Sequence, residues 1–317
     1  MKLVRYGEKG QEKHGIVDDQ DHIHALPDSV TNVPNMYAEE NLAAIRQLPI
    51  SGLPIVEGTP RLGACVAAPI IYGIGLNYKD HAAESGAAIP AEPIVFTKSA
   101  TTISGPNDEV IIPKDSKKTD WEAELGVVIG KRIDHEITPE EALNYVAGYC
   151  VVNDVSERER QLKKAPGNWT LGKNAPTFAP LGPWMVTKDE IPDPQNLRIT
   201  CEVNGKAMQD GNTKNMIFSV AQILSYMSKY MTIEPGTVIS TGTPAGVAMS
   251  GDLELRKDIQ TEDQLTAAQR ERKYLKPGDT MRLEVEGLGI QRQKCVAYDM
   301  SRAAEMGQDQ RGERKRA

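Results

Sequence analysis

The sequence predicts a β-rich α+β fold in which strands outnumber helices. Segments with the composition of strands are joined by hairpin-like turns, such as Asn204-Gly205 after the run at 197–203. Strand and helix patterns do not alternate regularly, so a repeated parallel βαβ arrangement is not expected. The chain has 317 residues, of which 39% are hydrophobic and 26% charged, which is enough for one large core and a small second unit.

The first 68 residues are predicted to form a small N-terminal α+β domain and its connector. Residues 1–26 are typical of a short hairpin with its turn at 18–21, and residues 37–48 have a helical pattern. The stretch from 49 to 69 is rich in proline and glycine, which places the boundary near residue 68. We therefore expect domains at 1–68 and 69–305, followed by a disordered tail at 306–317.

The main domain is expected to consist mostly of strands. Strands are predicted at 70–76, 110–113, 121–130, 149–154, 197–203, 236–242 and 280–289. One helix should begin at Thr138, with Pro139 at its first position and Glu141 completing a capping box, and end at Gly148. A second is predicted at 219–231 from its core spacing. The highly charged stretch 252–273 is expected to be an excursion with a surface helix.

Charge and composition exclude several classes of protein. The net charge is −7 without a long basic face, so nucleic acid is not an expected partner. No apolar stretch approaches the roughly 18 residues of a membrane span, and the N-terminus turns polar too early for a secretory signal. The four cysteines are widely spaced without a CxxC pair, which favours free buried thiols in a cytoplasmic protein over two disulfides.

Common nucleotide and hydrolase motifs are missing from the sequence. Gly73 and Gly75 follow a predicted strand, but Tyr78 stands where GxGxxG requires its third glycine. The sequence contains no GxxxxGK[ST], HExxH or GxSxG motif. Nucleotide cofactors and serine or zinc hydrolase chemistry are therefore discounted.

Three carboxylates alternate with apolar residues at the start of the strand predicted at 121–130. Asp120, Glu122 and Glu124 have one parity, so they should share one face of a half-buried strand. Their mutual repulsion requires water, basic neighbours or a metal ion. Asp154 ends the strand predicted at 149–154, and if the two strand ends are neighbours, Glu122, Glu124 and Asp154 converge. Such oxygen ligands suit Mg²⁺ or Mn²⁺, whereas a solvated acidic face is the alternative.

Arg158 and Gln161 follow Asp154 at helical spacing. If a helix begins near Ser156, all three side chains lie on one side of it. Arg158 could then bind a substrate carboxylate, and Gln161 could orient a carbonyl or a water molecule. Alternatively, Arg158 pairs with neighbouring glutamates on a polar surface helix.

His81 and Glu84 are one helical turn apart in the segment after the first strand of the main domain. A carboxylate beside an imidazole orients the ring and favours a general base, although an exposed pair without a catalytic role has the same spacing. Its nearness to Gly86 suggests a mobile lid. Lys173 could neutralise a developing enolate or be a surface lysine. The turn at 241–246, which contains Thr243, could hold a carboxylate through backbone amides and a hydroxyl.

Seven blocks of this sequence, in their order and spacing, resemble the fumarylacetoacetate hydrolase family. The blocks are GLNYKDHAAE, GPNDEVIIP, DWEAELGVVIG, YVAGYCVVNDVSERERQ, GKNAPTFAPLGPW, NGKAMQDGNT and ISTGTPAGV. The resemblance implies a mixed β-sandwich roll core, a small N-terminal domain and a homodimer. It implies that Mg²⁺ or Mn²⁺ is bound by Glu122, Glu124 and Asp154. It also implies a water-activating dyad of His81 and Glu84, and substrate contacts from Arg158, Gln161, Lys173 and Thr243.

Within that family the chain is most similar to a ureidoglycolate lyase-like branch that includes hydrolases of 2,4-diketo-3-deoxy sugar acids. It departs from the usual pattern at Ser99, at 174–176 and in the length of 252–273. The resemblance implies hydrolysis of a carbon–carbon bond in a 2,4-dioxo acid, either an acylpyruvate or a diketo-deoxy sugar acid. Two alternatives remain: decarboxylation, isomerisation or hydration of a 2-oxo acid on the same scaffold, and a non-catalytic metal-binding protein.

Overall fold

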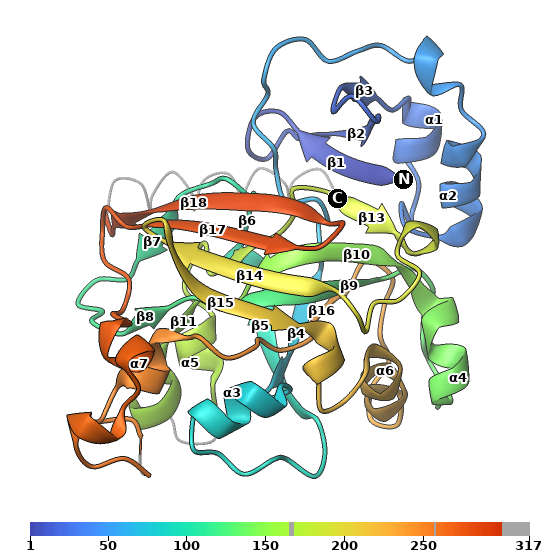
Figure 1. The fold of residues 1–317 in the computed structure, drawn as a ribbon. Coiled ribbons are helices and arrows are strands. Elements are labelled where there is room, and N and C mark those ends of the chain that lie inside the picture. The colour runs from blue at the N-terminus through green and yellow to red at the C-terminus, as the bar shows by residue number, and fades with distance from the viewer. Residues whose placement is uncertain (165–167, 257, 300–317) are drawn as a thin grey trace.

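Two β-sheets form the centre of the molecule, whose computed structural model describes residues 1–164, 168–256 and 258–299 (Figure 1). The predicted β-rich class is confirmed, because strands of both parallel and antiparallel pairing dominate and the described strands close no barrel. The predicted tail at 306–317 lies outside the described residues.

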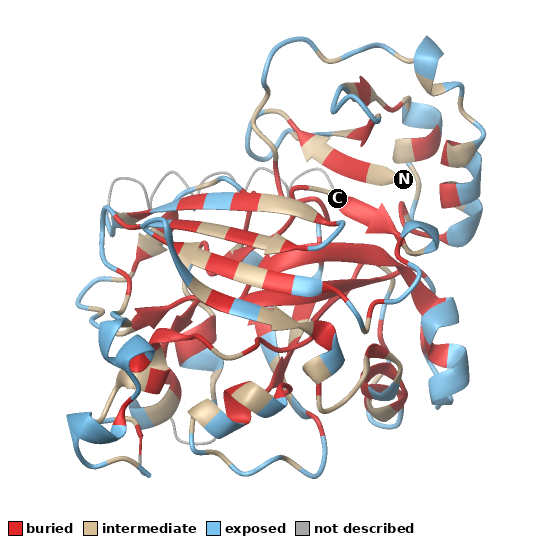
Figure 2. Ribbon diagram, viewed as in Figure 1, coloured by how far each residue is buried: buried red, intermediate tan, exposed pale blue. Residues whose placement is uncertain are grey.

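Within the described residues, the larger sheet has nine strands and runs from the N-terminal segment to the middle of the chain. Its spatial order is β3 (Ile23–Ala25), β2 (Lys13–Val17), β1 (Lys2–Tyr6), β13 (Met185–Thr187), β10 (Val146–Asn153), β9 (Ala123–Ile129), β16 (Val238–Ser240), β4 (Ile70–Gly75) and β5 (Ile94–Ser99). The strands β9 and β10 at its centre are buried along their whole length (Figure 2).

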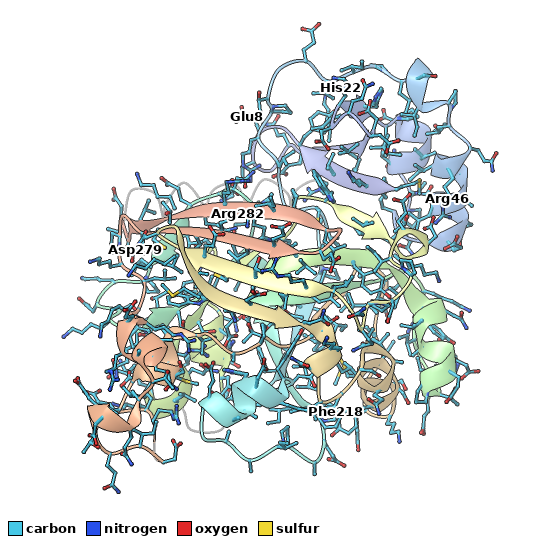
Figure 3. The ribbon with its side chains drawn as sticks, in the orientation of Figure 1. Glu8, His22, Arg46, Phe218, Asp279 and Arg282 are labelled. Carbon is cyan, nitrogen blue, oxygen red and sulfur yellow. The ribbon has the colours of Figure 1, made fainter. Side chains whose placement is uncertain are left out.

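The second sheet packs across this centre, with β14 and β17 in contact with β9 (Figure 1). Among the described residues it has five strands: β15 (Lys206–Asn212), β14 (Arg198–Val203), β17 (Thr280–Val285), β18 (Gly289–Ala297) and β7 (Val110–Ile112). Buried residues alternate with more accessible ones along β14 and β17, as in a sheet with one covered face (Figure 2). Arg282 is one of the accessible residues and lies on β17 (Figure 3).

Short helices and two short strand pairs complete the described structure. The strand pairs are β11 (Ser156–Glu157) with β8 (Thr119–Asp120), and β12 (Ala179–Pro180) with β6 (Ile103–Ser104). The α-helices are α1 (Asp28–Thr31), α2 (Glu39–Arg46), α3 (Lys79–Glu84), α4 (Pro139–Ala142), α5 (Thr170–Lys173), α6 (Val220–Ser228) and α7 (Ala267–Glu271). Figure 1 shows α3 at the opposite end of the view from β1–β3.

The N-terminal segment has three strands rather than the single hairpin predicted at 1–26. The expected turn at 18–21 does join β2 to β3, and β1 precedes them as a further antiparallel neighbour of β2. Hydrogen bonds between β1 and β13 connect this segment to the larger sheet. The domain boundary near residue 68 remains a prediction.

The helix expected near Ser156 begins two residues later, at Arg158. Ser156 and Glu157 form β11 instead, because their backbone pairs with Asp120 and Thr119 of β8. The amide of Arg158 continues this pairing by donating to the carbonyl of Lys118 at 2.9 Å. Arg158 and Glu159 open a helical segment that continues as a π-helical turn at Arg160–Lys164.

Two predicted elements begin correctly but end too late. The capping box of Thr138 and Glu141 is present, yet α4 ends at Ala142 because β10 begins at Val146, where the backbone pairs with β9. The strand predicted at 280–289 is divided by a tight turn into β17 and β18. Pairing with β9 therefore overrides the helical pattern after α4, whereas the second element is cut short by the local hairpin between β17 and β18.

The structure also bears on disulfides and membrane spans. The four cysteines are buried free thiols, as expected from their spacing. None of the helices in the described ranges has both the length and the apolar composition that a bilayer crossing would require.

Candidate active site

Antiparallel pairing of β9 with β10 brings the predicted carboxylates together. Asn153 at the end of β10 lies opposite Ala123 at the start of β9, and the amide of Asp154 donates to the carbonyl of Glu122 at 2.9 Å. Glu122, Glu124 and Asp154 each offer a carboxylate oxygen, and these oxygens lie within 4.8 Å of one another. Among the described residues, this is the cluster with the donors and spacing of a metal site.

Bulk water does not relieve the repulsion between these acids. The exposed fractions of Glu122, Glu124 and Asp154 are 5%, 2% and 0%. Trp121, Ala123 and Leu125, on the other face of the strand, are also buried, so the expected half-buried strand is buried on both faces. Compensating charge must therefore come from the protein or from a bound cation.

Two buried lysines balance part of this negative charge. Lys173, at the end of α5, donates from Nζ to Glu122 Oε2 and Asp154 Oδ2, both at 2.6 Å. Lys98, on β5, donates to Asp154 Oδ1 at 2.5 Å. Burial lowers the pKa of Lys98, whereas the attraction of Asp154 and Glu122 outweighs burial and raises the pKa of Lys173. Lys173 therefore lies at the metal site as a cation.

Arg158 is fixed in place by three side chains. Its guanidinium donates to Asp120 Oδ2 at 2.9 Å, to Glu122 Oε1 at 2.6 Å and to Gln161 Oε1 at 3.0 Å. Burial opposes ionisation of Glu122, but the charges of Arg158 and Lys173 hold its pKa well below the usual value. Arg158 and Gln161 thus lie beside the acids on the helical segment that begins at Arg158, and Arg158 orients Glu122.

Glu124 has different surroundings from the other two acids. Its Oε2 accepts hydrogen bonds from Ser240 Oγ at 2.5 Å and from the amide of Gly242 at 2.8 Å, both neutral donors. Burial, followed by repulsion from Asp154 and Glu122, raises the pKa of Glu124 well above its usual value. A divalent cation would supply the missing positive charge, and three carboxylate oxygens suit Mg²⁺ or Mn²⁺. The residues therefore fit such an ion.

The backbone after β16 holds carboxylates of the protein itself. Gly242 has a φ of 97°, a conformation that favours glycine, and this turns its amide toward Glu124. The amide of Gly246 donates to Glu84 Oε1 at 2.8 Å. Thr243, between them, donates from Oγ1 to the carbonyl of Ala123 at 2.8 Å. The turn at 241–246 thus binds carboxylates, as its composition suggests, but the ones it binds here are Glu124 and Glu84.

The histidine–carboxylate pair is formed on α3. His81 Nδ1 lies 3.1 Å from Glu84 Oε1, and the exposed fraction of His81 is 5%. Burial raises the pKa of Glu84, but the hydrogen bond with His81 outweighs it, and the pKa lies below the usual value. Because Nδ1 is held by Glu84, Nε2 is the ring nitrogen that remains for a water molecule.

The charged excursion at 252–273 contacts this pair directly. Arg272 donates from Nη1 to Glu84 Oε2 and to Ser250 Oγ, at 2.8 and 2.7 Å. Arg256 donates from Nη1 to the carbonyl of Glu84 and also to that of Ser250, the latter at 3.1 Å. The excursion therefore fixes both the side chain and the backbone of Glu84. The predicted surface helix within it is α7, preceded by a 3₁₀ turn at Glu262–Gln264.

One cavity of about 200 Å³ joins these groups. Every predicted site residue except Glu84 lines it: His81, Glu122, Glu124, Asp154, Arg158, Gln161, Lys173 and Thr243. The cavity thus places a candidate base, a candidate metal site and a buried ammonium around one volume, an arrangement suited to polarising a carbonyl compound and activating water against it.

Sequence reasoning missed several functional groups. Lys98, Ser240, Arg256 and Arg272 carry no local signal, because each reaches the site only through pairing with distant segments. Asp120 was grouped with the metal-binding acids by its parity, but its carboxylate accepts from Arg158 and from the amides of Ala248 and Met249. The break between β8 and β9 separates it from the other two acids.

Comparison with known proteins agrees with this arrangement. The family described as Fumarylacetoacetate (FAA) hydrolase C-terminal matches residues 70–296. A curated protein of Burkholderia orbicola (strain MC0-3), which bears only the provisional name of a hydrolase, is 48% identical over 296 residues, covering 93% of this chain and 98% of that protein.

Solved structures agree in fold over nearly the whole chain. Fumarylacetoacetate hydrolase of Exiguobacterium antarcticum is 30% identical with a TM-score of 0.76, covering 94% of this chain and 100% of that one. A 2-hydroxyhepta-2,4-diene-1,7-dioate isomerase of Mycobacterium marinum is 26% identical with a TM-score of 0.69, covering 94% and 98%. The matched descriptions name no branch within the family. Sequence and fold together show that this chain belongs to the fumarylacetoacetate hydrolase family.

Proposed function

We propose that this protein is a Mg²⁺- or Mn²⁺-dependent hydrolase that cleaves a carbon–carbon bond in a 2,4-dioxo acid. The observation that carries the proposal is that His81, paired with Glu84, lines the same cavity as the three buried acids and Lys173. Decarboxylation or isomerisation of a 2-oxo acid consumes no water, whereas hydrolysis needs a base that takes a proton from water, and the buried histidine–carboxylate pair offers one.

The proposed reaction consumes one water molecule. The substrate R–CO–CH₂–CO–COO⁻ and H₂O give R–COO⁻, H⁺ and pyruvate. His81 Nε2 takes a proton from water as the oxygen attacks the carbonyl of C4, and Glu84 stabilises the imidazolium. The C3–C4 bond then breaks and its electron pair stays on C3, giving the pyruvate enolate. Protonation of C3 completes the products.

The site residues have distinct roles in this proposal. Glu122, Glu124 and Asp154 would hold the cation, which supplies polarisation of the 2-oxo acid end and offsets the charge that develops there. Lys173 places an ammonium group at the same end of the cavity, where it stabilises the enolate. Arg158 and Gln161 keep Glu122 in position, and Thr243 supports the start of β9 beside it.

Product analysis with 2,4-dioxopentanoate tests the proposal. With Mg²⁺ or Mn²⁺ present, the expected products are acetate and pyruvate in equal amounts, measured by proton NMR against an enzyme-free control. Oxaloacetate is assayed in parallel. Release of carbon dioxide from oxaloacetate, with no acetate formed from the dioxo acid, would identify a decarboxylase and overturn the proposal. Rearranged substrate with no fragments would identify an isomerase, and no turnover of any 2-oxo acid would favour a metal-binding protein.

A further inference from the structure

Two aromatic rings form a wall of the cavity beyond its charged end. Phe96 on β5 and Trp169 just before α5 both line the cavity, with their ring centroids 5.4 Å apart and their planes tilted by 58°. The Nζ of Lys173 lies 4.9 Å from the centroid of the Phe96 ring. Phe96 therefore lies beside the buried ammonium of Lys173, and Trp169 packs against Phe96.

Glycines of β4 make room for both rings. A Cβ atom at Gly73 would lie 2.2 Å from the ring of Phe96, and a Cβ atom at Gly75 would lie 2.2 Å from the ring of Trp169. The two glycines are two residues apart on one strand, so they share a face of the sheet. A larger side chain at either position would displace a ring. The observed positions of Phe96 and Trp169 therefore require glycine at both residues.

Further apolar residues line the same cavity. Among the described residues they include Ile74, Leu76, Ala87, Leu162, Met249 and Leu255. Ser85 adds one neutral hydroxyl, and its buried Oγ has no hydrogen-bond partner within the described structure. Such a lining offers dispersion contacts and one hydrogen bond to a ligand, but no balancing charge.

The cations among the described lining residues are already engaged. Arg158 and Lys173 are held by the buried acids described above. Arg256 donates to Asp258 through Nε at 2.7 Å and Nη2 at 2.6 Å, and its Nη1 is bound to two backbone carbonyls. A second carboxylate on a ligand would have to displace Asp258 or enter without a partner, and a buried unpaired charge is costly.

We infer that the part of the cavity lined by Phe96 and Trp169 binds an uncharged apolar acyl group. This inference rests on the proposed function and specifies its substrate class. R in R–CO–CH₂–CO–COO⁻ is an alkyl or aryl group, seated against the aromatic wall. The same lining disfavours two other classes of substrate. Dicarboxylic substrates carry a second charge, and sugar acids have hydroxyls that require several hydrogen-bond partners.

A matched pair of substrates tests the inference. The compounds 2,4-dioxoheptanoate and 2,4-dioxoheptanedioate share the reacting end and differ in a terminal methyl against a terminal carboxylate. We expect kcat/KM for the methyl compound to be at least ~100-fold higher. Equal values, or preference for the dicarboxylate, would overturn the inference and leave the proposed function intact. If neither compound nor 2,4-dioxopentanoate is hydrolysed, the proposed function fails and the inference fails with it.

Substitution under the wall gives a second, independent test. Gly75→Ala should displace the Trp169 ring and lower the ratio of kcat/KM for 4-phenyl-2,4-dioxobutanoate to that for 2,4-dioxopentanoate by at least ~10-fold, mainly through KM. Gly52→Ala is the matched control, because the nearest atom to a Cβ there lies 3.9 Å away. If Gly75→Ala does not fold, the same ratio of kcat/KM values is measured for Trp169→Ala, and it should fall there too. An unchanged ratio in the folded variant would contradict the inference.

Discussion

The carboxylates of Glu122, Glu124 and Asp154 are chemically similar, but the residues around them divide them into two kinds. Lysine and arginine nitrogens contact Glu122 and Asp154, whereas Glu124 is held by a hydroxyl and an amide. The raised pKa of Glu124 follows from this difference. At the scale of single residues, the described side chains therefore supply counter-charge directly to two acids of the triad and hold the third through neutral donors.

Replacement of His81 separates the catalytic role from the metal-binding role. His81→Ala should lower kcat for 2,4-dioxopentanoate by at least ~100-fold, because the group that takes the proton from water is lost. The affinity for Mn²⁺ should stay within about threefold, since His81 is not among the three acids of the metal site. Steady-state kinetics and calorimetric titration measure the two quantities.

The control for this substitution is His135→Ala. His135 also lies next to an acidic residue, Asp134, but its side chain is 62% exposed. Its replacement should change neither quantity. Equal losses of turnover and Mn²⁺ affinity in His81→Ala would show that the division of roles is wrong.

At the scale of elements, the excursion at 252–273 determines how α3 is held. Arg256 binds the carbonyl of Glu84, and Arg272 binds its carboxylate on the oxygen opposite His81. With the amide of Gly246 also donating, both carboxylate oxygens of Glu84 have partners from segments far away in the sequence. The excursion thus contacts the histidine–carboxylate pair directly.

Arg272 is accordingly a positioning residue. Arg272→Ala should lower kcat about 10-fold and leave KM within about twofold, because Glu84 loses its fixed orientation while the groups around the substrate remain. Arg272→Lys should recover part of the loss, since the ammonium restores the charge but not the shape of the guanidinium. Steady-state kinetics measures the changes in kcat and KM separately.

The control for Arg272 is Arg270→Ala, at an exposed position of α7, the helix that ends just before Arg272. It should behave as the unsubstituted protein. A rise in KM without a fall in kcat in Arg272→Ala would contradict a positioning role.

At the scale of the whole molecule, the features that the sequence predicts are those set by a local residue pattern, such as helix starts and hairpin turns. Residue parity along 120–125 and a strand ending near Asp154 predicted that Glu122, Glu124 and Asp154 converge if the two strand ends are neighbours, and the antiparallel pairing of β9 with β10 meets that condition. Caps predicted the start of α4, and the Asn204-Gly205 turn predicted the hairpin of β14 and β15. These features involve residues close together in sequence or strands that follow one another.

What could not be predicted depends on contacts between distant segments. Lys98 approaches Asp154 because β5 lies at the edge of the larger sheet, beyond β4 and β16. The expected helix starts at Arg158 rather than near Ser156, because β8 offers backbone partners to Ser156 and Glu157. No local pattern specifies which strands become neighbours, so the counter-charges around the acids could be found only in the folded chain.

The central claim is that Glu122, Glu124 and Asp154 hold a catalytic cation. Calorimetric titration of metal-depleted protein with Mn²⁺ tests it most directly, with turnover of 2,4-dioxopentanoate measured on the same samples. The unsubstituted protein should bind one ion per chain and regain turnover as the site fills. Glu124→Gln should bind at least ~100-fold more weakly, because a ligand charge is lost. Glu40→Gln, at an exposed position on α2, should match the unsubstituted protein. Unaltered Mn²⁺ affinity in Glu124→Gln, or full turnover by the metal-depleted protein, would contradict the claim that these acids hold a catalytic cation.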